Sequence, residues 1–265
     1  MTSLTQQPVQ RTIQVAGGAV RIRHGGAGPP LVILHHDIGN PGWLRFHELL
    51  AEDFTVYVPD IPGYGQSDRP QWARNVRDLV ALLHLTLDEL DFQDVVLVGL
   101  GYGGWLAAEL ATTAQRRFTH LVLVGAAGIQ PRDGEIVDQF LIAHEEYVKL
   151  GFHDPANFTR QFGEIASDEQ LVEWDICREI TTRVAWQPYM FNRALPELLK
   201  SVRTPTLVVW GSDDRIVPLV CGEQYVETLP AARLVTIHGS GHFVEMEEPV
   251  RLAELVAEHA ATARG

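Results

Sequence analysis

Short, uninterrupted apolar runs recur along most of this 265-residue chain and alternate with segments of helical periodicity. A strand that is apolar at every position needs cover on both faces, which a parallel sheet wrapped by helices provides. Six such runs lie at residues 31–34, 55–58, 95–98, 121–124, 206–210 and 234–237. This alternation predicts an α/β fold with a mostly parallel sheet of about eight strands and helices on both faces.

Two further strands are expected near the beginning of the chain, at residues 12–15 and 20–24, joined by a hairpin at Gly17 and Gly18. The alternation breaks at residues 128–200, where aromatic residues stand among polar ones in mainly helical patterns. We interpret this segment as a helical cap inserted between two strands, with residues 1–127 and 201–265 forming the core. Most aromatic rings of the cap are expected to pack within it, and some to face a pocket.

Composition narrows the class of protein. The chain is 46% hydrophobic and 21% charged, as is typical of globular proteins, and its net charge of −13 without a basic run argues against nucleic-acid binding. Cys177 and Cys221 lie far apart, so the sequence indicates neither a disulfide framework nor a zinc motif. No segment has the length of a membrane span, and residues 1–8 lack the pattern of a signal peptide. We expect a cytoplasmic protein with a small-molecule substrate and no membrane partner; a homodimer is left open.

The sequence Gly-Leu-Gly-Tyr-Gly at residues 99–103 lies between a predicted strand and a predicted helix. This is the form and the context of the G-x-S-x-G nucleophile elbow, a sharp turn that presents a serine above a sheet. Gly101 stands where that serine is expected. A glycine relieves the backbone strain of such a turn and removes its nucleophile.

Two more turns follow the elbow in the chain order of the α/β-hydrolases, which is nucleophile, acid, histidine. Asp214 lies in the turn after residues 206–210, and His242 lies in a glycine-flanked loop after the last predicted strand. A carboxylate that holds one imidazole nitrogen leaves the other nitrogen free to take a proton, so this pair is typical of acid–base catalysis. Asp213 is the less favoured register for the acid.

The chain resembles α/β-hydrolase fold proteins over nearly its whole length. Besides the three turns, it has Asp-Ile-Pro-Gly-Tyr-Gly-Gln-Ser at residues 60–67, close to the family's D-x-P-G-x-G-x-S segment, and His-His-Asp-Ile-Gly at residues 35–39, which matches the oxyanion loop in part. It is most similar to the capped branch that contains carbon–carbon bond hydrolases of aromatic degradation, haloalkane dehalogenases, epoxide hydrolases and esterases. The resemblance implies that Asp214 and His242 are the family's acid and histidine.

Around the elbow, the resemblance implies that the backbone amides of Tyr102 and Asp37 are oxyanion donors. His36 departs from the family's usual glycine, and we expect His35 and His36 to lie at the substrate pocket, with His36 as a hydrogen-bonding group. A metal at residues 35–37 is not favoured, because adjacent residues rarely converge on one ion. Ser240 is not favoured as a displaced nucleophile. No cofactor motif is apparent, so no cofactor is expected.

Three functions remain open from the sequence. The first is a hydrolase of a small apolar or aromatic substrate, acting on an ester or a carbon–carbon bond, whose serine is absent by natural change or by an introduced substitution. The second is non-serine chemistry by the His242–Asp214 dyad, such as water activation, a lyase reaction or cofactor-free oxygenation. The third is a noncatalytic small-molecule binding protein, which has no evident need for the acid–base pair.

Overall fold

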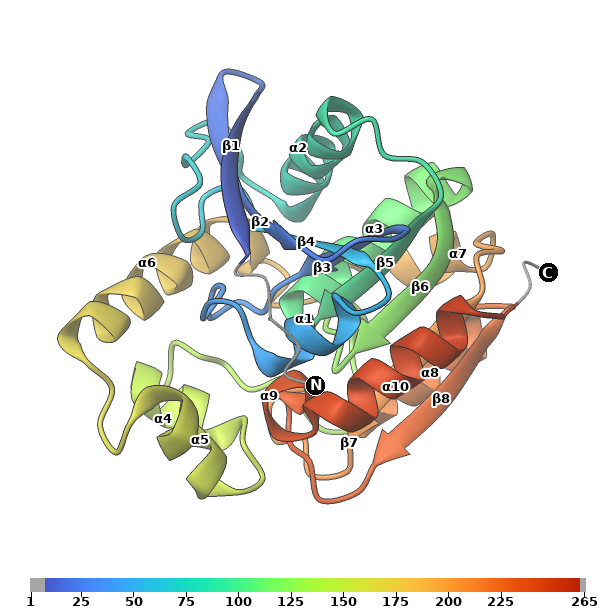
Figure 1. The fold of residues 1–265 in the computed structure, drawn as a ribbon. Coiled ribbons are helices and arrows are strands. Elements are labelled where there is room, and N and C mark those ends of the chain that lie inside the picture. Colours follow the sequence, from blue (N-terminus) through green and yellow to red (C-terminus); the bar gives the residue numbers. More distant parts are fainter. Residues whose placement is uncertain (1–7, 263–265) are drawn as a thin grey trace, which may run out of the picture.

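The computed structural model describes residues 8–262 and shows one eight-stranded sheet, in the order β1-β2-β4-β3-β5-β6-β7-β8 (Figure 1). β2 pairs antiparallel with β1 and β4, and all other neighbouring strands are parallel. The strands are β1 (Val9–Val15), β2 (Gly18–Gly25), β3 (Pro30–Leu34), β4 (Thr55–Pro59), β5 (Val95–Leu100), β6 (Phe118–Val124), β7 (Thr206–Gly211) and β8 (Ala232–Ile237). The prediction of a mostly parallel α/β sheet is confirmed, whereas residues 1–7, which were assessed for a signal peptide, lie outside the described residues.

Several strands begin earlier than their apolar runs predict. β1 starts at Val9, β6 at Phe118 and β8 at Ala232. The additional residues include the polar side chains of Gln10 and Arg233, which are exposed. Backbone pairing therefore continues past the stretch that is covered on both faces, and an apolar run marks only the buried part of a strand.

Helices cover both faces of the sheet (Figure 1). Side chains of α1, α9 and α10 build the core on one face, and those of α2, α3 and α8 build the core on the other. These helices are α1 (Arg45–Leu50), α2 (Val76–Glu89), α3 (Tyr102–Ala114), α8 (Leu219–Thr228), α9 (Val244–Glu247) and α10 (Pro249–Ala260). No helix among residues 8–262 is long and apolar enough to cross a membrane.

Between β6 and β7 the chain forms four more helices: α4 (His144–Leu150), α5 (Pro155–Phe162), α6 (Asp168–Ala185) and α7 (Leu195–Leu199). In Figure 1, α4, α5 and α6 lie together beside the sheet, and we call these three helices with their connecting loops the insert. α7 instead packs against α3 and α8. Rings of the insert pack on one another, namely those of Phe152, Phe158, Phe162 and Trp174. The exact division into core and cap stays a prediction.

Candidate functional site

Gly101 forms the turn between β5 and α3. Its φ is +51° and its ψ is −110°, in the left-handed region that favours glycine, and its N–H donates to the Val124 carbonyl at 2.8 Å. Two residues on, a Cβ at Gly103 would stand 2.2 Å from the Leu34 carbonyl oxygen, so only glycine lets α3 dock on the end of β3. The elbow backbone is therefore present although position 101 carries no nucleophile.

Asp214 lies in the turn between β7 and α8. Its Oδ1 accepts the backbone N–H groups of Ile216 and Val217, both at 2.9 Å, and its Oδ2 lies 2.8 Å from His242 Nδ1. Backbone donors of this kind hold the carboxylate in one orientation. The neighbouring Asp213 has a side chain that is 41% exposed and faces a histidine of the insert instead. The structure thus brings His242 together with Asp214 and not with the alternative acid.

His242 reaches the elbow from the loop after β8, with 1% of its surface exposed. Its Nε2 lies 2.8 Å from the point where a Cβ at position 101 would stand. Burial disfavours the charged imidazolium, but the nearby carboxylates of Asp214, Asp37 and Glu245 outweigh this cost and raise the pKa of His242 above its ordinary value. The ring can therefore hold a proton and release it at the space above the elbow.

His35 is turned away from this space. Its Nδ1 donates to the His36 carbonyl at 2.7 Å, and its Nε2 accepts the Ile61 N–H at 3.0 Å. Burial lowers the pKa of His35 to about 4, which keeps the ring neutral. Both nitrogens are used within the protein, so His35 orders the loop at residues 35–39 and leaves no ring nitrogen for a ligand. Across residues 8–262, no three His, Cys, Asp or Glu side chains are grouped as a metal site.

His36 projects into the elbow. A Cβ at Gly101 would stand only 2.3 Å from His36 Nδ1 and 3.0 Å from its Cε1. On the far side of the ring, Nε2 lies 3.2 Å from Glu245 Oε2. The ring packs edge-on against His242 and Phe243, with centroids 4.8 Å apart in both contacts. His36 thus occupies the volume that a side chain at position 101 would need.

Asp37 contributes a buried carboxylate as well as a backbone amide. Tyr147 Oη and Gln139 Nε2, which precede the strand β7 in the inserted region, donate to its Oδ2 at 2.9 and 3.0 Å. This carboxylate is among those that raise the pKa of His242. The oxyanion role of the Asp37 and Tyr102 amides stays a prediction; as the first residue of α3, Tyr102 has an N–H without an acceptor inside the helix.

Sequence reasoning missed Glu245 and Tyr147. Glu245 lies three residues after His242, in the short helix α9, and is 1% exposed. The sequence gives no local signal for it, because its partner His36 lies 209 residues away in the chain. Tyr147 carried no signal, since its partner Asp37 lies 110 residues away in the chain.

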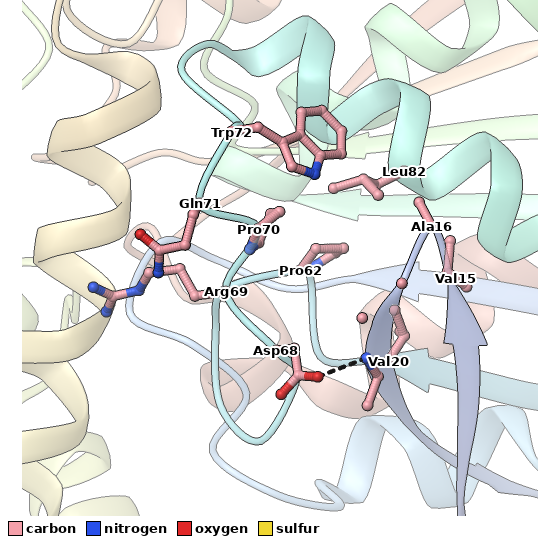
Figure 2. Close-up of a pocket in the computed structure, with 13 residues that line it drawn as sticks. Val15, Ala16, Val20, Pro62, Asp68, Arg69, Pro70, Gln71, Trp72 and Leu82 are labelled. Carbon is pink, nitrogen blue, oxygen red and sulfur yellow. Dashed lines mark hydrogen bonds between the residues drawn. The ribbon is translucent and has the colours of Figure 1, made fainter.

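The described residues also form two open pockets. Figure 2 shows one of about 460 Å³ between the β1–β2 hairpin and the loop that carries Asp68, Pro70 and Trp72, where Asp68 accepts the Ala19 N–H at 2.8 Å. The other, of about 400 Å³, lies where α6 meets the loop after β3 and is lined by charged residues such as Arg23. Two histidine–carboxylate pairs make up the site, His242–Asp214 and His36–Glu245, and neither pocket is lined by any of these residues. Those pairs are enclosed, which strengthens their electrostatic interactions.

Comparisons with known proteins agree with this fold. A family model described as the alpha/beta hydrolase family matches residues 31–255. The 2-hydroxy-6-oxononadienedioate/2-hydroxy-6-oxononatrienedioate hydrolase of Cupriavidus pinatubonensis is 26% identical over 280 residues, covering 97% of this chain and 96% of the relative. Two solved structures, each 22% identical, share the fold: a membrane phospholipase A (TM-score 0.83, 97% of this chain and 87% of that one) and a variant of the meta-cleavage product hydrolase CumD (0.80, 95% and 97%).

Proposed function

This chain belongs to the α/β-hydrolase family, and from its site we propose that it hydrolyses an ester or a carbon–carbon bond in a small apolar or aromatic substrate, with His242 as the acid–base group. The observation that carries the proposal is the orientation of His242. Its Nδ1 is held 2.8 Å from Asp214 Oδ2, and its Nε2 lies 2.8 Å from the Cβ position of residue 101. A buried, oriented imidazole at the end of the elbow is what proton transfer to and from a reacting acyl group requires.

The names of relatives support the class of reaction. The Cupriavidus relative is named as a hydrolase of a hydroxy-oxo-dienedioate, and a structural relative is a meta-cleavage product hydrolase. A receptor without activity is less well supported, because a binding pocket gains nothing from an imidazole whose pKa is raised by three buried carboxylates. Two expectations stay predictions from the sequence, a cytoplasmic location and the lack of a cofactor. Whether the protein forms a homodimer stays open.

The test is turnover of p-nitrophenyl esters of aromatic and short aliphatic acids, and of vinylogous diketones, in water labelled with oxygen-18. We expect one class to yield a carboxylic acid that contains the labelled oxygen. His242→Ala should lower kcat by about 10²–10⁴-fold, the usual contribution of a general acid–base group. The matched control is His84→Gln, because His84 lies on α2 and its Nε2 hydrogen-bonds to Thr113 Oγ1 on α3, at 2.7 Å.

Three results would contradict the proposal. Equal turnover by His242→Ala would remove this residue from the reaction. A product without the labelled oxygen would favour lyase or oxygenase chemistry by the same dyad. Tight binding of these compounds without any turnover would favour a receptor.

A further inference from the structure

We propose that His36 is the nucleophile of this enzyme, attacking the substrate through Nδ1 in place of the missing serine. The inference rests on the proposed hydrolytic function and assigns a second catalytic residue to the same site. It is carried by the position of the Nδ1 atom, by the partner of the opposite nitrogen, and by the way two departures from the family's sequence fit together in space.

The first argument is position. A Cβ at Gly101 would stand 2.3 Å from His36 Nδ1 and 2.8 Å from His242 Nε2. The hydroxyl of an elbow serine lies one bond beyond its Cβ, beside the catalytic histidine. His36 Nδ1 therefore lies in the volume that the serine side chain would occupy, within reach of the same acid–base group.

The second argument concerns the proton of His36. An ionised carboxylate can only accept, so Glu245 Oε2 at 3.2 Å holds the proton on His36 Nε2. In the neutral tautomer that this contact favours, the proton-free nitrogen is Nδ1, the ring nitrogen that faces the elbow. Nδ1 is buried and has no hydrogen-bond partner among the described residues. Buried polar atoms are rarely left unpaired, and a catalytic role is one explanation for such an atom.

The third argument is that the two sequence departures complement each other. The resemblance to α/β-hydrolases implies glycine at position 36 and serine at position 101, whereas this chain has histidine and glycine. An imidazole at 36 and any side chain at 101 exclude one another, because the contact would be 2.3 Å. An introduced Ser→Gly substitution would account for position 101 alone. This exclusion fits a nucleophile that comes from the loop after β3 in place of one at the elbow.

The ring is also held rigidly. The rings of His242 and Phe243 pack edge-on against it, with ring centroids 4.8 Å away in both cases. Only 2% of the surface of His36 is exposed. His35 fixes the backbone beside it through the hydrogen bond to the His36 carbonyl. A nucleophile that is held in place before the substrate arrives loses little entropy in the reaction.

The chemistry balances without a cofactor. In the first half, the Nδ1 lone pair attacks the acyl carbon, the leaving group departs with the electrons of the broken bond, and the His242 imidazolium protonates it. The product is an acyl group on His36, whose positive charge is offset by Glu245. In the second half, neutral His242 takes a proton from water, the resulting hydroxide attacks the acyl carbon, and the electrons of the carbon–nitrogen bond return to Nδ1. One water is consumed, and both histidines regain their starting protons.

The test is acyl transfer from p-nitrophenyl pivalate, a hindered ester chosen to slow the second half-reaction. After an acid quench, we expect one pivaloyl group per chain, mapped to His36 by mass spectrometry. His36→Gln removes Nδ1 but keeps an amide that can donate to Glu245; it should lose the adduct and at least about 10²-fold in kcat. His84→Gln should keep both.

The outcomes separate this inference from the proposed function. Turnover that depends on His242 but leaves no acyl group on His36 would overturn the inference and keep the hydrolase. An acyl group on Ser240 or on His242 would overturn it as well. So would activity that is lost on chelation and restored by Zn²⁺, because Nδ1 would then be a metal ligand. If His36→Gln does not fold, as judged by circular dichroism, the adduct site on the unaltered chain decides.

Discussion

The site contains two histidine–carboxylate pairs, His242–Asp214 and His36–Glu245, whose imidazole rings meet edge-on but whose carboxylates are held differently. In the first, Asp214 is anchored by two backbone N–H groups at 2.9 Å and lies 2.8 Å from His242. In the second, Glu245 lies 3.2 Å from His36 and comes from a helix of only four residues. The first pair is the more tightly held, as a group that must move a proton in both directions requires.

The difference between the pairs shows how the nucleophile can come from another loop while the backbone of the elbow is kept. The elbow at Gly101 keeps its left-handed turn, and the His242 loop keeps its approach to that turn. The atom above the turn is His36 Nδ1, which comes from the loop after β3, the strand next to β5 in the sheet.

The two carboxylates should differ in how much activity their removal costs. Both are positioning residues, and replacing each carboxylate by its amide leaves the size of the side chain nearly unchanged. We expect Asp214→Asn to lower kcat by about 10³–10⁴-fold, because the comparable change in a serine protease triad leaves the wrong tautomer of histidine and costs about 10⁴-fold. Glu245→Gln should cost less, about 10–10²-fold, since an amide oxygen can still accept from His36. The measurement is the pH profile of kcat, which a purely structural role would leave unshifted.

Equal losses from the two changes would erase the distinction between an acid–base pair and a nucleophile pair. A larger loss from Glu245→Gln would reverse the roles that we assign. Circular dichroism and thermal unfolding of both variants serve as the control for folding.

The exclusion between positions 36 and 101 can be measured as a coupling energy. Gly101→Ser alone should be destabilised, by roughly 1–3 kcal/mol for the strained backbone and by roughly 1–3 kcal/mol for the overlap with His36. Adding His36→Gly should relieve the overlap, with a favourable coupling of at least about 1 kcal/mol. The measurement is urea unfolding of the two single variants and the double variant.

The same double variant should react with a serine-directed phosphonate, because its hydroxyl would then face His242. Gly101→Ser by itself should not be labelled, since His36 already fills the volume of the hydroxyl. Additive stabilities together with labelling of the single variant would show that His36 moves aside freely and would weaken its assignment as a fixed group.

The fold and one of the pairs could be read from the sequence because their signals are local. Buried strands appear as apolar runs, and Gly101, Asp214 and His242 each sit in a turn with a recognisable pattern. The register of the acid also emerges from the pattern, and the structure brings Asp214 to His242.

The second pair could not be read in this way because its signals are distant. His36 stands out as a departure from glycine. Residue 101 lies 65 positions further along the chain, and nothing in the sequence indicates that the His36 ring fills the space above it. Glu245 is one of several acids after His242, and only packing selects it. Likewise, the Asp37 carboxylate is bound by Tyr147, which lies 110 residues along the chain. Volume complementarity between remote residues leaves no periodic trace.

A last contrast, between the site and the rest of the core, lies in how the free energy of unfolding responds to pH. His47 on α1 is buried, which lowers its pKa to about 3, and its Nδ1 accepts the Leu44 N–H at 3.1 Å. Below pH 6.5 the unfolded chain takes up a proton at this residue and the folded chain does not, so stability should fall as the pH drops from 6.5 toward 3, by about 1.4 kcal/mol per pH unit.

The contribution of His242 to stability should depend on pH in the opposite direction. Its raised pKa makes the folded chain bind the proton more tightly than the unfolded chain, so its contribution is complete below pH 6.5 and is lost as the pH rises through the raised value. Unfolding by urea at a series of pH values should therefore show a shallower acid slope in His47→Gln and a shallower loss above pH 6.5 in His242→Gln. A His242→Gln variant with an unchanged alkaline limb would mean that the three carboxylates around the site do not hold a proton there, and the first half-reaction would then lack its acid.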